Sequence, residues 1–386
     1  MTRAWPRLLA ILAIACAGTA CGSGNDSPGP ASDDGGGAGD DGSGGGGDPG
    51  GGGDDGGDDG GGDDGGGGGT APEGLVFSAY KDTSINMNWN TNVISTVVPG
   101  SSTPLADDMT AASARAITLS FATGECGAEN WGGLPGDAMA AANVPLFTDA
   151  GIDYILSTGG AAGSFTCASD DGFTAFLDRW ASPHLVGVDL DIEAGQSEAD
   201  IASLIARIEP AHAAHPELRF SLTLATLANT DGAESFNAKG VQVIEAALDA
   251  FGGALPSYVT VNLMTMDYGS PGPSVCVVND GGDRCDMGRS AIQAAQNLQA
   301  AWGVPLSNVE LTPMIGGNDV QSNVFSLDDA DTIAGFAIEN GLAGVHYWSY
   351  DRDLDCPPGA ASPVCNSLGD SGPHGFLQRF LDAGLE

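Results

Sequence analysis

The chain has 386 residues, 51 of them acidic and 12 basic, so its formal net charge is −39 at pH 7. Twelve of the acidic residues fall within 22–70 and two of the basic ones within 1–21, which leaves a charge near −29 on the rest. A field of that sign argues against nucleic acid or anionic lipid as a partner, whereas a neutral polysaccharide would be indifferent to it.

Residues 1–21 hold two arginines, then an apolar run, then small residues. The apolar run is too short to span a bilayer, so we predict a signal peptide for export. The AGTA sequence before Cys21 resembles the lipobox of bacterial lipoproteins, although Gly18 stands where that motif usually has Leu. We therefore expect lipidation of Cys21 and a cell-surface or outer-membrane location, with the lipid as the only membrane contact. Simple secretion is the alternative.

Residues 22–72 consist mainly of Gly, Asp and Ser, without Lys, Arg or aromatic residues. Such a segment buries too little apolar surface to offset its ordering entropy, so we predict a disordered linker. A calcium-binding glycine-aspartate repeat is the alternative, but those repeats need an aliphatic residue in each unit. The linker is expected to hold the following domain, residues 73–386, away from a membrane.

Short apolar runs alternate with amphipathic helical patterns along this domain. The predicted strands cover 75–80, 116–122, 153–160, 185–193, 220–226, 258–269, 309–317 and 344–351, and helical patterns include 198–208, 240–251, 289–302, 329–339 and 376–384. This alternation predicts an α/β fold with a parallel sheet covered on both sides. Eight such units favour a closed (β/α)₈ TIM barrel. No GxGxxG follows the first strand, so no dinucleotide is indicated, and we expect no cofactor.

Six cysteines lie beyond the predicted signal, and an even number in an exported chain suggests disulfides. They are Cys126, Cys167, Cys276, Cys285, Cys356 and Cys365. Six cysteines allow fifteen pairings. The simplest of them joins 276 to 285, 356 to 365 and 126 to 167. A zinc site is the alternative, but no CxxC or nearby Cys/His spacing supports it.

Several predicted strands end at or beside polar or aromatic residues: Tyr80, Glu193, Asp267, Asn318 and Trp348. In a barrel the carboxyl ends of the strands form the active-site face. These side chains are therefore candidates for a common site, although any of the aromatic ones could merely close the barrel mouth.

The fourth predicted strand, LVGVDLDIE, places Asp189, Asp191 and Glu193 at every second position. Side chains two apart on a strand share one face. Close carboxylates cannot all stay ionised cheaply, so one should hold a proton at neutral pH. Glu193 is nearest the mouth and is the natural proton donor. A calcium or magnesium site is the alternative, but one strand supplies too few ligands, and we expect no metal.

No second strand carries an obvious carboxylate nucleophile, and Asp267 is the only reasonable candidate. Ordinary glycosidases need two acids across the bond. In substrate-assisted hydrolysis, the 2-acetamido oxygen of the sugar attacks instead. Asp191 would then orient that acetamido group while Glu193 protonates the departing oxygen.

The motifs resemble family 18 glycoside hydrolases, the chitinases and their relatives. VDLDIE is similar to the DxxDxDxE signature, STGG (157–160) to the SxGG motif, and NLMTMDYG (262–269) to the sixth-strand motif. GVHYWSYDRD (344–353) is similar to the family's eighth strand, and LTPMIGGND (311–319) to the seventh strand of a bacterial chitinase subgroup. The resemblance runs from about Leu75 to the C-terminus, with the motifs in the family's order.

The resemblance implies roles for individual residues. Glu193 would be the acid and then the base that activates water, Asp191 would hold the acetamido nitrogen, and Asp189 would share a proton with it. Ser157 and Tyr80 would lie near Asp189 and tune it. The sugar would be contacted by Met264, Asp267, Tyr268 and Trp348, the last stacking under its apolar face. Trp131 is a candidate platform for a neighbouring sugar, or else a tryptophan that packs its own loop.

Two positions depart from the family pattern. Val186 replaces the first Asp of the signature, and Met266 stands where a tyrosine is usual, so Tyr268 is a possible substitute. The acid itself is intact. We expect a monomeric hydrolase of β-1,4-linked N-acetylglucosamine polymers, most simply a chitinase. An endo-β-N-acetylglucosaminidase of N-glycans and a non-catalytic chitin-binding lectin are the alternatives.

Overall fold

The computed structural model describes residues 74–193 and 195–385. The predictions for the signal peptide, for Cys21 and for the linker 22–72 lie outside these residues. Among the described residues, no helix is both long and apolar enough to cross a bilayer.

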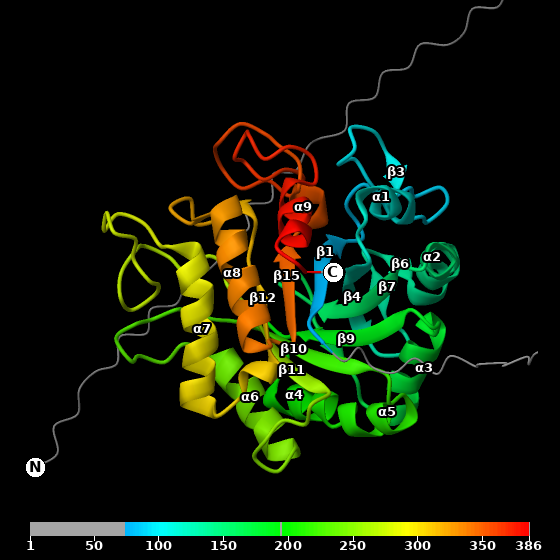
Figure 1. The fold of residues 1–386 in the computed structure, drawn as a ribbon. Coiled ribbons are helices and arrows are strands. Elements are labelled where there is room, and N and C mark those ends of the chain that lie inside the picture. The colour runs from blue at the N-terminus through cyan, green and yellow to red at the C-terminus, as the bar shows by residue number, and fades with distance from the viewer. Residues whose placement is uncertain (1–73, 194, 386) are drawn as a thin grey trace, which may run out of the picture. The chain divides into compact units, whose positions relative to one another are not determined.

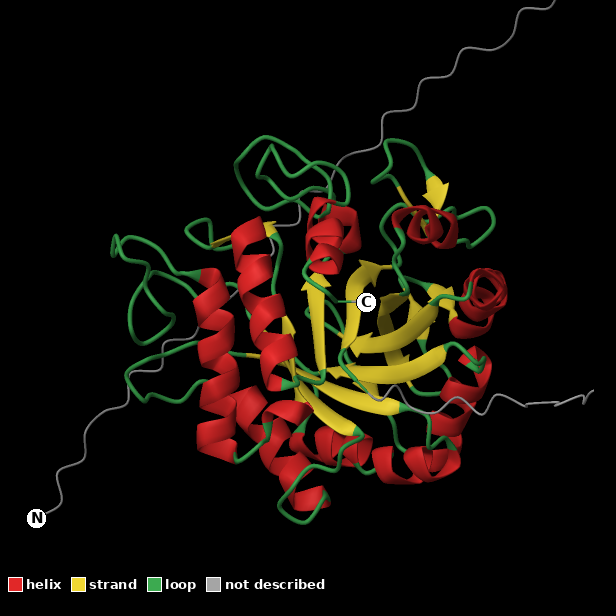
Figure 2. Ribbon diagram, viewed as in Figure 1, coloured by secondary structure: helices red, strands yellow, loops and turns green. Residues whose placement is uncertain are grey.

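The described residues form a closed barrel of parallel strands with helices around it (Figures 1 and 2). Its eight strands are β1 (Val76–Asp82), β4 (Ala116–Glu125), β7 (Asp153–Gly159), β9 (Leu185–Asp191), β10 (Arg219–Ala225), β11 (Val259–Met264), β12 (Val309–Thr312) and β15 (Gly344–Trp348). The ring closes because β1 pairs in parallel with both β4 and β15. The predicted TIM barrel is confirmed.

Helices cover the outside of the ring. They are α1 (Leu105–Ala112), α2 (Gly136–Ala150), α3 (Asp170–Trp180), α4 (Glu198–Ile205), α5 (Ile208–Ala214), α6 (Ala238–Ala250), α7 (Met287–Trp302), α8 (Leu327–Asn340) and α9 (Gly375–Asp382). Ser197 and Ser326 begin α4 and α8 with reciprocal capping boxes, made with Asp200 and Asp329. Such caps satisfy backbone N–H groups that have no partner inside the helix.

Short strands and 3₁₀ turns lie in the loops at the ends of the barrel. These are β2 (Ser95–Thr96), β3 (Thr103–Pro104), β5 (Asn130–Trp131), β6 (Leu134–Pro135), β8 (Phe165–Thr166), β13 (Gly316–Gly317) and β14 (Val324–Phe325), with 3₁₀ turns η1 (Leu306–Asn308) and η2 (Tyr350–Arg352). β5 folds back antiparallel onto the carboxyl end of β4.

Four strands end two or more residues earlier than predicted, at Asp191, Met264, Thr312 and Trp348. Pro313 follows β12 and has no N–H to continue a ladder. After β11 the chain turns at Asp267, whose φ is 51°. A 3₁₀ turn follows β15. Glu193 and Asp267, which were predicted as strand residues, therefore lie in the loops that follow β9 and β11, whereas Tyr80 and Trp348 lie on β1 and β15.

The three disulfides join Cys126 to Cys167, Cys276 to Cys285 and Cys356 to Cys365. This is the simplest of the pairings that the sequence allows, and it is confirmed. All three clip loops that follow the carboxyl ends of barrel strands.

Candidate active site

Three acids lie in and just beyond β9. Asp189 and Asp191 alternate with Val188 and Leu190, which are fully buried on the opposite face of the strand. Glu193 follows two residues after the strand ends and is half-buried. The acids therefore run from inside the barrel to its carboxyl-end mouth, as the spacing predicts.

Asp189 is the innermost acid, and four hydroxyl groups from three other strands surround it. Its Oδ2 accepts hydrogen bonds from Tyr80 Oη at 2.9 Å and Ser157 Oγ at 2.6 Å. Its Oδ1 accepts from Ser221 Oγ at 2.9 Å and Thr223 Oγ1 at 2.5 Å. Burial raises the pKa of Asp189, and these hydrogen bonds act against the rise. The predicted proximity of Tyr80 and Ser157 to Asp189 is confirmed.

Asp191 has a different environment. It is 3 % exposed, and its Oδ1 has no hydrogen-bond partner among the described residues. Burial raises the pKa of Asp191 well above its usual range, and the nearby charges of Glu193 and Asp189 raise it further. Burial also raises the pKa of Glu193. The outer two acids thus keep a proton to higher pH than isolated carboxyl groups do.

Two glycines allow the chain to pack closely against the acidic strand. A Cβ on Gly159 would lie 2.1 Å from the carbonyl oxygen of Asp191, and the φ of Gly159 is 86°. A Cβ on Gly160 would lie 3.0 Å from the ring of Phe121. The backbone N–H of Gly160 donates to the Asp191 carbonyl at 3.1 Å. These contacts explain why the STGG sequence ends in two glycines.

Aromatic side chains line the mouth beside the acids. Trp348 is half-buried and stacks on Phe121, with ring centroids 5.7 Å apart and planes at 22°. Its ring centroid also lies 6.1 Å from that of Tyr80. Peptide bonds next to both members of the stack are cis, at Ser120–Phe121 and Trp348–Ser349. The indole is therefore next to Tyr80, which reaches Asp189, and its contact with a sugar stays a prediction.

Asp267 lies in the loop after β11 and is tied to the loop after β12. Its carboxylate accepts from the Val320 N–H at 2.8 Å, and its own N–H donates to Asn318 Oδ1 at 3.2 Å. Burial raises the pKa of Asp267. Met264 ends β11 and is half-buried, whereas Tyr268 is only 2 % exposed. The sugar contacts predicted for these residues stay predictions.

Trp131 requires a correction. It lies on β5, is fully buried and packs against Trp180 of α3, with ring centroids 4.9 Å apart. An indole inside the core has no face free for a sugar. The alternative reading, a tryptophan that packs its own loop, is the one the structure supports.

Sequence reasoning missed Ser221, Thr223, Asn262 and Phe121. The signal for the first two was available, because they alternate with leucine and phenylalanine in FSLTLAT as the acids do in the fourth strand. Their register places Ser221 beside Asp189 and Thr223 beside Asp191. Within the described parts of the chain, no group of three or more His, Cys, Asp or Glu side chains is arranged to hold a metal ion.

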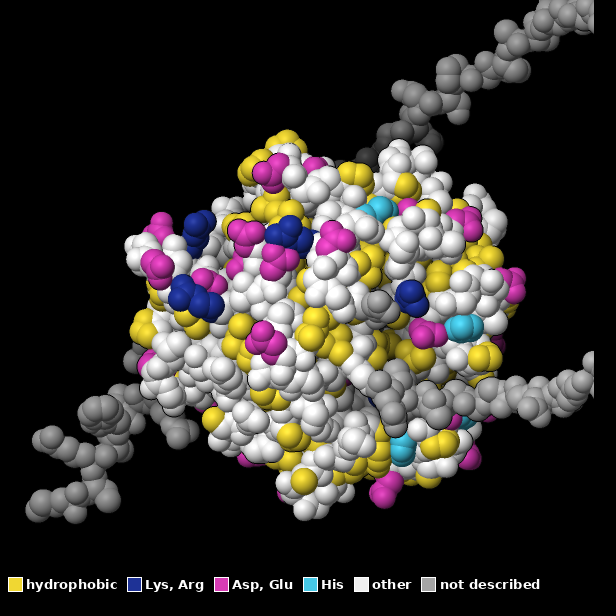
Figure 3. All heavy atoms as spheres, in the orientation of Figure 1, with side chains coloured by type: hydrophobic (Ala, Val, Ile, Leu, Met, Phe, Trp, Pro, Cys, Tyr) yellow, Lys and Arg dark blue, Asp and Glu magenta, His cyan; other side chains and the backbone are white. Residues whose placement is uncertain are grey.

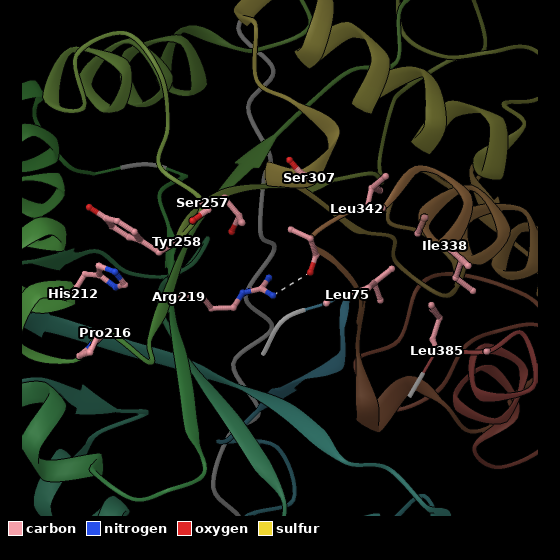
Figure 4. A pocket seen from close by; sticks show the side chains of 16 residues that line it. Leu75, His212, Pro216, Arg219, Ser257, Tyr258, Ser307, Ile338, Leu342 and Leu385 are labelled. Carbon is pink, nitrogen blue, oxygen red and sulfur yellow. Dashed lines mark hydrogen bonds between the residues drawn. The ribbon is translucent and has the colours of Figure 1, made fainter. Parts of the chain in front are cut away.

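A separate cavity of about 890 Å³ lies at the amino ends of the strands, away from the acids (Figure 4). Leu75, Arg219, Tyr258 and Leu342 are among its lining residues. Arg219 forms a buried ion pair with Glu310 and donates to the Ala343 carbonyl at 3.1 Å. This ion pair engages the charged groups of both Arg219 and Glu310, and removing either partner would leave the other buried and unpaired.

No protein-family model matches the chain. In sequence it is 29 % identical over 237 residues to a probable bifunctional chitinase/lysozyme of Escherichia coli, covering 55 % of this chain and 24 % of that protein. It is 28 % identical over 249 residues to endochitinase 11 of Metarhizium anisopliae, covering 58 % of this chain and 44 % of that protein. The chain thus matches less than half the length of either curated relative.

Solved structures share the architecture. The catalytic domain of a hyperthermophilic chitinase from Pyrococcus furiosus superposes with a TM-score of 0.61 and 24 % identity, over 81 % of this chain and 95 % of that one. A Group IV chitinase of Ostrinia furnacalis gives a TM-score of 0.50 and 10 % identity, over 81 % of this chain and 100 % of that one. The barrel has the fold of chitinase catalytic domains.

Proposed function

We propose that this protein is a chitinase-like glycoside hydrolase that cleaves β-1,4 linkages between N-acetylglucosamine units. The observation that carries the proposal is the row of Asp189, Asp191 and Glu193 running out to the barrel mouth, with the pKa raised for each. The similarity to proteins named as chitinases supports it. A related Pyrococcus furiosus chitinase domain was solved with chito-oligosaccharides, which supports the same class of substrate.

In the first step Glu193 gives its proton to the glycosidic oxygen as the bond from that oxygen to the anomeric carbon breaks. The acetamido oxygen of the same sugar attacks the anomeric carbon and forms a cyclic oxazolinium ion. Asp191 holds the acetamido N–H, and its buried Oδ1 is the atom left without a protein partner among the described residues. Positioning the internal nucleophile in this way lowers the entropic part of the barrier.

In the second step Glu193, now a carboxylate, takes a proton from water while the water oxygen attacks the anomeric carbon. The ring of the oxazolinium ion opens, and the acetamido group is restored. Two displacements at one carbon retain its configuration. Glu193 recovers its proton and is ready for another cycle, which needs no cofactor.

The surface charge fits a neutral polymer. Acidic side chains are scattered over the face shown in Figure 3 and basic ones are few, so this face offers no concentrated basic patch. Net negative charge disfavours polyanionic partners. Three disulfides in the described domain also support export to an oxidising compartment, and we propose a secreted or lipid-anchored location.

Product analysis by mass spectrometry tests the activity. N-acetylglucosamine oligomers are incubated with the full chain and with Glu193→Gln, which keeps the size of the side chain but cannot donate the carboxyl proton. We expect shorter oligomers from the native protein and a rate lower by about 10²–10⁴-fold in the variant. Glu198→Gln, an exposed acid in the first turn of α4, is the matched control and should cut normally.

The outcomes separate the alternatives. If both proteins bind the oligomers and neither cuts them, the domain is a lectin and the proposal fails. If only N-glycans are cut, the mechanism holds but the substrate is that of an endo-β-N-acetylglucosaminidase. Equal cutting by Glu193→Gln would assign the acid elsewhere.

A further inference from the structure

The hydroxyl groups around Asp189 are arranged as donors to an anion. The carboxylate accepts four hydrogen bonds, two on each oxygen, at 2.5–2.9 Å. A protonated carboxyl group would have to donate one hydrogen itself and would lose at least one of these interactions. Hydrogen bonds to an ionised acceptor are also the stronger kind. The four hydroxyl donors therefore favour the charged form of Asp189.

Asn262 of β11 fixes the direction of two of these hydroxyl groups. Its Nδ2 donates to Tyr80 Oη and to Thr223 Oγ1, both at 2.8 Å. A hydroxyl oxygen that accepts from an amide leaves its own hydrogen free to donate onward, here to Asp189. Asn262 Oδ1 accepts from Thr312 Oγ1 at 2.7 Å. Thr312 Oγ1 can pair with either end of the amide, but only this orientation lets Tyr80 and Thr223 accept from Asn262 while both donate to Asp189.

The neighbouring acid, Asp191, lacks such donors among the described residues at one of its carboxylate oxygens. Asp191 receives no hydrogen bond at Oδ1 from any described residue, and that atom is buried. The titratable groups near Asp189 are Tyr80 on β1, Asp191 on its own strand and Glu193 beyond it. His346 on β15 contacts Tyr80, with its ring centroid 6.2 Å from that of Tyr80. A proton shared among the carboxyl groups is therefore better placed on the outer two.

We propose that Ser221, Thr223 and Asn262 are positioning residues that hold Asp189 ionised. By doing so they keep the shared proton on Asp191 and Glu193, where the leaving oxygen needs it. The inference rests on the proposed function for its catalytic meaning, whereas the charge state of Asp189 is measurable without activity.

The first test is the pH dependence of kcat/KM for Thr223→Val on a fluorogenic N-acetylglucosamine oligomer. Valine keeps the shape of threonine but removes one donor, so the pKa of Asp189 rises. The acid limb of kcat/KM reports groups of the free enzyme that must be ionised. We expect this limb to move to higher pH by about one unit, and the double variant with Ser221→Ala to move it further. Asn262→Leu should move it in the same direction.

Thr118→Val is the matched control. Thr118 is a buried barrel threonine whose hydroxyl pairs with Ser78 at 2.7 Å, and among the described residues it is not one of the donors to Asp189. The acid limb of the kcat/KM profile of Thr118→Val should lie at the same pH as that of the native protein. Thermal unfolding of each variant checks that it folds. If Thr223→Val does not fold, the single variant Ser221→Ala replaces it in the test. An unchanged acid limb in a folded Thr223→Val protein overturns the proposal.

The second test is independent of catalysis. Carboxyl ¹³C chemical shifts of labelled aspartate are followed against pH, with Asp189→Asn and Asp191→Asn to assign the two signals. We expect Asp189 to stay ionised at pH values where Asp191 is protonated, and its titration to move up by about one unit in Thr223→Val. An Asp189 that is protonated at neutral pH in the native protein would refute the inference. Correct titration without any hydrolysis would instead refute the proposed function alone.

Discussion

The proton balance among three closely spaced acids depends on what surrounds each carboxyl group. Asp189 accepts four hydrogen bonds, while Asp191 is equally buried and its Oδ1 has no described partner. One strand thus presents chemically identical side chains in opposed environments. Such a contrast separates the pKa values of neighbouring acids and assigns them different tasks.

Gly159 gives a prediction at the residue scale. In Gly159→Ala the new Cβ would meet the Asp191 carbonyl oxygen at 2.1 Å, so β7 or β9 must shift. We expect activity to fall at least 10-fold, since a displacement of about 1 Å is costly in a catalytic site. Gly133→Ala is the control, because Gly133 has a similar positive φ of 97° and no neighbour within 4 Å.

In the Gly133→Ala control, the free energy of unfolding should fall only by the cost of a residue with a Cβ in the left-handed region, about 1–2 kcal/mol. Its activity should be normal. Denaturant unfolding and oligomer hydrolysis measure the two effects. Equal losses in both variants would show that strain at positive φ, and not the contact with Asp191, limits position 159.

At the scale of elements, disulfides clip the loops of the active-site face. The Cys126–Cys167 bridge spans a sequence separation of 41 residues and joins the loops after β4 and β7, while the other two bridges each span 9. Closing a longer loop removes more conformational freedom from the unfolded chain. The long bridge should therefore stabilise the domain most.

Replacing both cysteines of one bridge by serine tests this order. We expect the free energy of unfolding to fall by about 4 kcal/mol for the 126–167 pair and by about 2.5 kcal/mol for the 276–285 pair. Guanidinium denaturation of the oxidised proteins measures both. A larger loss from the short bridge would mean that native-state contacts, rather than loop closure, dominate.

At the scale of the whole molecule, buried acids give stability a dependence on pH. Asp353 accepts from the N–H groups of Phe376 and Leu377 at the start of α9, and burial raises its pKa to about 6. Burial would also raise the pKa of Glu310, but the charge of Arg219 and the hydrogen bond with His346 outweigh it and lower the pKa to about 2. The two acids therefore act in different pH ranges.

The signs follow from proton linkage. Folded Asp353 binds its proton more tightly than the unfolded chain does, so stability rises as pH falls from about 6 to about 4, by about 3 kcal/mol. Glu310 binds its proton less tightly when folded, so stability falls as pH drops from about 4 towards 2. We expect the highest melting temperature near pH 4–5.

Thermal unfolding across this range is the measurement, with Asp353→Asn as the test variant. The amide should flatten the rise between pH 6 and 4, whereas Asp249→Asn, at an exposed position of α6, should leave it unchanged. A native protein whose melting temperature climbs steadily from pH 4 to pH 7 would contradict the prediction.

The eight barrel strands and the row of acids could be predicted because both depend on local spacing. Nearly continuous apolar runs identify strands buried on both faces, and a two-residue period puts the acids on one side. The strand ends were less predictable, because they depend on contacts such as that between the loop of Asp267 and Asn318.

Trp131 and Asn262 show what local patterns miss. The burial of Trp131 depends on β5 folding back onto β4 and meeting Trp180, which is 49 positions further along the chain. The role of Asn262 depends on which strands become neighbours in the ring, since it contacts Tyr80, 182 positions away. Neither relation leaves a periodic signal in the sequence.

The pairing of β1 with β15 has a consequence for the order in which the protein can be made. β1 can pair with β4 early, but its other edge stays unpaired until Gly344–Trp348 have been synthesised. Until then β1 and β12 expose unpaired backbone edges, which invite association with other chains. Any nascent chain that stops before Gly344 lacks a closed ring, and it should need protection by chaperones until its last strand is added.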